Sequence, residues 1–173
     1  MKNTIKKVWN IVTNILVVLV LIFAILTVGV RLVGLDTYVV LSGSMEPLFQ
    51  TGSVIYVKDI ETAELQEGDI ITFQMNADTV ATHRIIEVVE ENGTTAFRTK
   101  GDANDVEDGS AVPASQVIGT PVFTIPQLGY LVAYIQSPSG RYATIAAGAF
   151  LLLMVFLPDV IFGNDKKSKE KSE

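Results

Sequence analysis

The feature that most constrains the fold is an uncharged apolar run near the start of the chain. Residues 11–30, IVTNILVVLVLIFAILTVGV, contain no charged side chain. A helix of this length spans about 30 Å, which is the thickness of a bilayer hydrocarbon core. A removable signal peptide has a shorter apolar core followed by small residues such as Ala-x-Ala, whereas this run continues into GVRLVGLD. The run therefore predicts an uncleaved transmembrane anchor.

A second apolar segment lies near the other end of the chain. Residues 142–156, YATIAAGAFLLLMVF, are uncharged after Arg141, and the apolar character continues less strongly to residue 162. Pro158 and Asp159 interrupt its end. We expect a second transmembrane helix over residues 142–162, and the hydrophobic content of 49% agrees with two spans.

Lysines flank both apolar runs. They are Lys2, Lys6 and Lys7 before the first run, and Lys166, Lys167, Lys169 and Lys171 after the second. Lys-rich flanks remain on the cytoplasmic side of a membrane. The pattern predicts a multi-pass cell-membrane protein with cytoplasmic tails at 1–10 and 163–173 and with residues 31–141 outside. Trp9 suits the aromatic belt at the membrane interface.

The charge of the middle region excludes some classes of function. Residues 31–141 hold 15 Asp and Glu against 6 Lys and Arg. Such an acidic domain has no electrostatic footprint for nucleic acid, so we expect no nucleic-acid partner. The chain has no cysteine, which excludes disulfides, thiol chemistry and cysteine metal sites.

Short β-prone runs separated by turns fill the middle region. Strands are expected at residues 53–58, 69–75, 79–91, 94–100 and 115–125. Asn92-Gly93 between two such runs is a strong hairpin signal. No helical period is sustained over these runs, so they predict a mainly β domain, a small closed or partly open barrel. The segment 126–140 differs, and either a membrane-surface segment or a buried amphipathic turn fits it.

Three segments carry residues suited to nucleophilic chemistry. Ser44 lies in the turn VVLSGSMEPLF, and His83 is the only histidine in the chain. Asp102, Asp105 and Asp108 lie in KGDANDVEDG, which lacks the calcium-loop pattern, so we expect no metal or cofactor. A serine nucleophile needs an imidazole to accept its proton and a carboxylate to orient the imidazole. Spacing alone leaves open whether these groups meet.

Together, these segments resemble signal peptidase I. SGSMEP (42–47) is similar to the nucleophile box of that family, and THRIIEV (82–88) and TKGDANDVEDG (99–109) resemble the next two boxes in the same order. The likeness runs from the anchor through IPQLGYL (125–131). Most bacterial members have a lysine in the second box, whereas this chain has His83. It therefore resembles the endoplasmic-reticulum type, also found in archaea and some Gram-positive bacteria.

The resemblance implies a fold, an activity and a set of residue roles. The fold would be a signal-peptidase-like β-barrel catalytic domain flanked by N-terminal and C-terminal transmembrane helices. The activity would be that of a membrane-bound serine endopeptidase that removes signal peptides from exported preproteins after small residues at −1 and −3. The roles assigned are Ser44 as nucleophile, His83 as general base, Asp108 as triad acid, Asp102 as a second important carboxylate and Ser42 as an oxyanion-hole hydroxyl. Which aspartate faces His83 stays open.

The resemblance also implies how substrate binds. An extended preprotein would add as a strand beside TYVVLS, and its side chains would enter shallow apolar pockets at Val39, Val40 and Met45. The partners implied are signal-peptide-bearing preproteins and the lipid bilayer, with room for accessory subunits.

Two alternatives remain beside this interpretation. A Ser-Lys dyad would use Lys58 or Lys100, and a buried lysine base would need a strongly lowered pKa, for which the sequence offers no sign. The other alternative is a non-catalytic membrane-anchored module that binds or assembles exported proteins. Such a module would be expected to lose its nucleophile or base, whereas Ser44 and His83 are both present.

Overall fold

The computed structural model describes residues 2–91 and 93–162, which form two compact units. We call Met1–Gly29 with Tyr134–Glu173 the helical unit and Val30–Ala133 the β unit. The β unit ends earlier than the expected boundary at residue 141. The lysine-rich tail expected at 163–173 lies outside the described residues.

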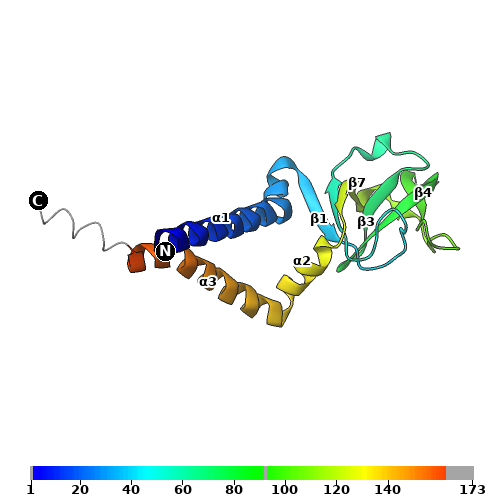
Figure 1. Ribbon diagram of the computed structural model, residues 1–173. Coiled ribbons are helices and arrows are strands. Elements are labelled where there is room, and N and C mark those ends of the chain that lie inside the picture. The colour runs from blue at the N-terminus through cyan, green and yellow to red at the C-terminus, as the bar shows by residue number, and fades with distance from the viewer. Residues whose placement is uncertain (1, 92, 163–173) are drawn as a thin grey trace, which may run out of the picture. The chain divides into compact units, whose positions relative to one another are not determined.

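The helical unit contains two long apolar helices (Figure 1). They are α1 (Lys2–Thr27) and α3 (Pro138–Phe162). Their segments Thr4–Thr27 and Pro138–Pro158 are long and apolar enough to cross a membrane. Helix α3 begins before the expected residue 142, because Ser137 and Pro138 form a helix start: the Ser137 hydroxyl accepts the Gly140 N–H at 3.0 Å.

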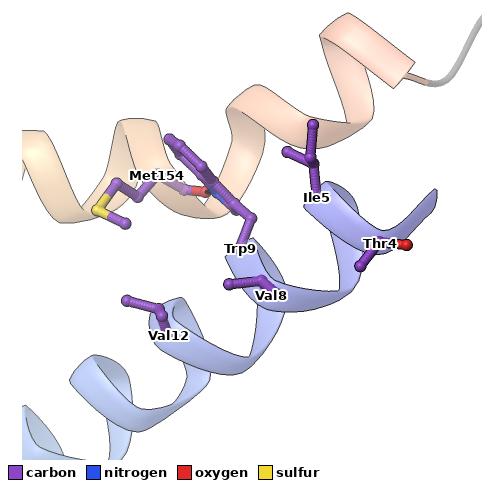
Figure 2. Close-up of a pocket in the computed structure, with 6 residues that line it drawn as sticks. All are labelled: Thr4, Ile5, Val8, Trp9, Val12 and Met154. Carbon is purple, nitrogen blue, oxygen red and sulfur yellow. Dashed lines mark hydrogen bonds between the residues drawn. The ribbon is translucent and has the colours of Figure 1, made fainter. Parts of the chain in front are cut away.

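A hydrogen bond from Trp9 joins α1 to α3. The indole Nε1–H donates to the backbone carbonyl of Met154 at 2.8 Å, and Figure 2 shows the ring reaching from α1 to α3 at this point. Met154 lies four residues before Pro158, which has no N–H and so leaves the Met154 carbonyl without its helical partner. The indole therefore supplies the donor that this carbonyl lacks within its own helix.

We predict that Trp9→Phe lowers the stability of the helix pair by about 1 kcal/mol, because it leaves the Met154 carbonyl without a hydrogen-bond donor. Thermal unfolding in detergent micelles measures the loss. Pro158→Ala restores an N–H to that carbonyl, so the cost of Trp9→Phe should shrink in the Pro158→Ala background. An equal cost in both backgrounds would show that the indole does not act through this carbonyl.

The β unit is built on a seven-stranded antiparallel sheet of order β1-β2-β7-β3-β4-β5-β6. Its strands are β1 (Leu35–Val39), β2 (Val54–Lys58), β3 (Ile70–Asn76), β4 (Thr79–Glu91), β5 (Thr94–Lys100), β6 (Val112–Pro113) and β7 (Val117–Ile125). Three 3-10 turns accompany them, at Gly29–Val33, Thr62–Glu64 and Ala114–Gln116. The five expected strands are confirmed within two residues at each end, whereas β1 and β6 are additional to them.

The expected hairpin joins β4 to β5. Glu91 pairs with Thr94 across the two strands, and Gly93 has a φ of +75°, which a glycine adopts without strain. Asn92, the other residue of the expected turn, lies outside the described residues. The register places Arg84 opposite Lys100 and Ile85 opposite Thr99 at the far end of the same pair.

Two apolar clusters form the core of the β unit. One lies around β3, β4 and β5 and consists of Leu65, Ile71, Phe73, Ile85, Phe97 and Val112. The other consists of Met45, Phe49, Ile55 and Val57, and so joins the segment after β1 to β2. Burial of the second cluster holds the turn around Ser44 against the sheet, since its apolar residues are removed from water there.

The segment 126–140 contains a helix, α2 (Leu128–Gln136). Gly129 at its start packs on Gly52: the Gly129 N–H donates to the Gly52 carbonyl at 2.9 Å, and a Cβ on Gly129 would lie 2.7 Å from that oxygen. Gly129 is the buried residue of the helix, whereas Tyr130 and Leu131 are exposed. The start of α2 is therefore held on the turn before β2, whereas the side chains of Tyr130 and Leu131 are left exposed.

Candidate active site

The turn that carries Ser44 is held by backbone hydrogen bonds before it and by buried apolar side chains after it. Past the end of β1, the Val40 N–H donates to the Ser53 carbonyl at 2.9 Å, and the Gly52 N–H donates to the Val40 carbonyl at 2.8 Å. Met45 is only 2% exposed and lies in the cluster with Phe49. The residue that follows Ser44 is thus buried in the core, which fixes the position of the turn.

The side chain of Met45 lies in the core of the β unit. We expected Met45 to line a substrate pocket, but the structure places its side chain in the core, where its Sδ accepts the Asp102 N–H at 3.4 Å. An apolar residue beside a candidate nucleophile fits either place. Val39 and Val40 are half-buried. Val39 is the last residue of β1 and pairs with Val54 of β2.

The imidazole of His83 lies between a serine and a carboxylate. His83 is on β4 opposite Ile71 of β3 and is 7% exposed, with its ring edge-on to Phe73 at a centroid distance of 6.2 Å. Its Nε2 is 3.2 Å from the Ser44 Oγ, and its Nδ1 is 2.6 Å from the Asp108 Oδ2. An ionised carboxylate only accepts hydrogen bonds, so Nδ1 carries the proton and Nε2 is left as the acceptor for the Ser44 hydroxyl.

The structure resolves which aspartate faces His83. Asp108 does, and it is tied to β5 twice: its N–H donates to the Thr99 carbonyl at 2.9 Å, and the Thr99 hydroxyl donates to its Oδ2 at 2.6 Å. Thr99 was not among the expected site residues. The one signal for it is its position at the start of the third motif, directly before Lys100 and Gly101.

Asp102 has a different partner. Both of its carboxylate oxygens accept from Arg84, from Nε at 2.8 Å and from an Nη at 2.6 Å. The Arg84 hydrogen bonds lower the pKa of Asp102, and the same bonds raise the pKa of Arg84. Arg84 also donates to the Gly68 carbonyl at 2.8 Å. Asp102 therefore fastens its loop to β4, one residue after His83, without contacting the imidazole by a hydrogen bond.

The loop after β5 also grips the backbone of the serine turn. The Ala103 N–H donates to the Ser44 carbonyl at 2.9 Å, and a Cβ on Gly101 would lie 2.6 Å from the same oxygen. Only glycine permits so close an approach. The loop that carries Asp108 and the turn that carries Ser44 are thus joined directly.

The remaining expected residues lie at the edge of this arrangement. The Ser42 Oγ is 3.3 Å from the Ser44 Oγ, and either atom can donate. If the Ser44 hydroxyl points at His83, Ser42 is the donor of the two. Lys58 is exposed at the end of β2, and neither it nor Lys100 bonds to Ser44 within residues 2–91 and 93–162. The structure offers no support for a serine–lysine dyad.

Comparison with known proteins identifies relatives of this chain. The family model for "Signal peptidase, peptidase S26" matches residues 11–96. The chain is 39% identical over 120 residues to "Signal peptidase I W" of Bacillus subtilis, covering 65% of this chain and 63% of the relative. It is 34% identical over 126 residues to the "Signal peptidase complex catalytic subunit SEC11C" of Homo sapiens, covering 66% of each.

A third relative is covered more fully. The chain is 32% identical over 129 residues to the "Signal peptidase complex catalytic subunit SEC11" of Eremothecium gossypii, covering 69% of this chain and 75% of the relative. Matches of this identity and coverage assign the chain to a class of peptidases. The chain belongs to the signal peptidase family S26. It spans a little under two thirds of the length of the Bacillus subtilis and human relatives.

We predict that Asp102→Asn destabilises the β unit by about 0.5–1 kcal/mol near neutral pH, since the pair is bidentate but Arg84 is partly exposed and screened by solvent. The pKa of Asp102 is lowered in the folded state, so its contribution is fully present above the unfolded value of about 3.9. It is lost as the pH falls through the lower folded value. The difference in unfolding free energy between the wild type and Asp102→Asn should therefore be constant from about pH 5 to 8 and shrink below about pH 4.

Thermal unfolding across this pH range measures the difference. Asp105→Asn is the matched control, because it removes the same charge from the same loop at an exposed residue. A difference that persists unchanged at the lowest pH, or an equal loss in Asp105→Asn, would contradict the ion-pair account.

Proposed function

We propose that the protein is a membrane-bound serine endopeptidase that removes signal peptides from exported preproteins. The observation that carries this proposal is the continuous chain of hydrogen bonds from the Ser44 hydroxyl through His83 to the Asp108 carboxylate. Family membership supports it from a separate direction, because the relatives are named as signal peptidases.

The reaction follows from the proton positions at the three side chains. As the Ser44 Oγ attacks the scissile carbonyl, its proton passes to the His83 Nε2, and Asp108 stabilises the imidazolium through Nδ1–H. The tetrahedral intermediate collapses when the Nε2–H protonates the leaving amine, which releases one product and leaves an ester on Ser44. Water then attacks this ester with His83 again as base, which releases the second product and restores Ser44.

The oxyanion of the intermediate needs donors close to Ser44. We assign this role to the Ser44 N–H and the Ser42 hydroxyl, and the proximity of Ser42 to Ser44 supports it. Donors of this kind typically contribute on the order of 3–4 kcal/mol of transition-state stabilisation. Asp102 is assigned an indirect role, because its bonds hold the loop that bears Asp108.

The proposed substrate path is the edge of the sheet at β1. This strand is the terminal member of the sheet, and its sequence runs directly toward Ser44. An extended preprotein segment pairing with β1 would gain main-chain hydrogen bonds, and Val39 and Val40 would face its side chains. Small pockets there would suit the small residues at −1 and −3 that the resemblance implies. Met45 is assigned to holding the turn, since it is buried.

The proposal includes a membrane topology. We infer that α1 and α3 both span the bilayer, that both tails are cytoplasmic and that the β unit lies outside; the apolar helices and the lysines of the tails support this. We also infer a partly open barrel, because register shifts within β2, β3 and β4 curve the sheet. Accessory subunits are proposed by analogy with relatives named as subunits of a complex.

Replacing either proton-transfer residue tests the proposed activity. Ser44→Ala and His83→Ala should each lower preprotein processing by at least about 10³-fold, since members of such a triad act as a unit. The readout is conversion of a preprotein in proteoliposomes. Lys58→Ala and Lys100→Ala should process normally, which excludes the dyad. Normal processing by Ser44→Ala or His83→Ala would contradict the role assigned to that residue. No processing by the wild type would instead favour a non-catalytic binding protein.

The rate should also depend on pH in one direction. A protonated imidazole cannot accept the Ser44 proton, so processing should decline as the pH is lowered and His83 becomes protonated. The profile of kcat/KM against pH in proteoliposomes measures this. Full activity at pH 4 would contradict the assignment of His83 as base.

A further inference from the structure

We propose that Thr99 is a positioning residue of the proposed triad, whose hydroxyl holds the Asp108 carboxylate where its Oδ2 accepts the His83 Nδ1–H. This inference rests on the proposed peptidase function and deepens it. The observation behind it is that the Thr99 Oγ1 and the His83 Nδ1 each lie 2.6 Å from the same carboxylate oxygen.

The two partners of that oxygen lie on paired strands of the sheet. Thr99 lies on β5 opposite Ile85 of β4, and His83 lies two residues before Ile85 on the same strand. Alternate residues of a strand share a face, so the Thr99 and His83 side chains project from the same face of the β4–β5 pair. Thr99 is 1% exposed, and its branched side chain has few rotamers to choose from.

Asp108, by contrast, lies outside the strands. It belongs to the segment between β5 and β6, so no ladder of backbone bonds fixes its side chain. Its two side-chain torsions leave the carboxylate free to turn unless other groups hold it. The bond from the Asp108 N–H to the Thr99 carbonyl fixes its backbone, and the bond from the Thr99 hydroxyl fixes the carboxylate. Thr99 therefore holds Asp108 at both ends.

Water cannot readily replace the threonine hydroxyl. The side chains of His83 and Asp108 are 9% and 18% exposed, and Thr99 is 1% exposed. A carboxylate oxygen that loses a donor in such a place is not compensated by solvent. The hydroxyl thus contributes to the orientation of the imidazole through Asp108, without touching the substrate.

A simpler account is that Asp108 merely satisfies a buried threonine hydroxyl. The same sheet offers a comparison, because the hydroxyl of Thr72, which is fully buried on β3, bonds to the hydroxyl of Thr82 at 2.8 Å. A buried threonine here is thus satisfied without a carboxylate. Thr72→Val removes an equally buried hydroxyl from β3, on the other side of β4, and serves as the matched control for Thr99→Val.

The kinetic test compares Thr99→Val, Thr99→Ser and Thr72→Val with the wild type on one preprotein in proteoliposomes. Thr99→Val should lower kcat about 10- to 100-fold, the usual effect of a lost hydrogen bond to a charged group, with KM within about twofold. Thr99→Ser should restore most of kcat, and Thr72→Val should process as the wild type does. Thr99→Ala supplies the same deletion if Thr99→Val does not fold.

A spectroscopic test reports on the triad without any substrate. His83 is the only histidine, so ¹⁵N-histidine labelling isolates the low-field resonance of its Nδ1–H bonded to Asp108. Thr99→Val should shift or broaden this resonance, whereas Thr99→Ser and Thr72→Val should retain it. An unchanged kcat and resonance in Thr99→Val, or equal losses in Thr72→Val, would overturn the role of Thr99. An inactive wild type with the expected resonance changes would overturn the proposed function alone.

Discussion

The hydrogen bond between the His83 Nδ1 and the Asp108 Oδ2 is the interaction on which the site depends. At 2.6 Å it sets which imidazole nitrogen carries the proton, and so leaves Nε2 facing Ser44 as an acceptor. The surrounding contacts keep that bond in place. Thr99 holds the carboxylate, Arg84 and Asp102 fasten the loop, and Ala103 joins the loop to the Ser44 carbonyl. Ser44, His83 and Asp108, which lie far apart in the chain, are thereby joined by hydrogen bonds.

The same need to pair polar groups governs the helical unit. Pro158 in α3 has no N–H, so the Met154 carbonyl lacks its usual helical partner. Trp9 supplies the missing donor from the other helix. Each unit thus contains a polar group that its own element cannot satisfy, Met154 in a helix and Asp108 in a loop, and in both cases a residue from another segment supplies the bond.

Much of this arrangement could be predicted from the sequence, where the signal was local. Alternating β-prone runs placed five strands, and the apolar runs indicated both long helices. The motifs named Ser44, His83, Asp102 and Asp108 as candidates. What could not be predicted depended on the path of the backbone. Only the fold shows that the Asp108 N–H meets the Thr99 carbonyl, which turns Asp108 rather than Asp102 toward His83. Met45 was assigned to substrate because an apolar residue beside a nucleophile carries no signal of which way it points.

The most direct test of the account is detection of the ester that it requires on Ser44. Protein mixed with excess preprotein would be quenched in acid within the first turnovers, digested and analysed by mass spectrometry. The account predicts that the peptide containing Ser44 gains the mass of the signal-peptide acyl group, which is the free signal peptide less one water, and that the His83→Ala protein shows no such adduct. Cleaved preprotein together with an adduct on another residue would contradict Ser44 as the nucleophile.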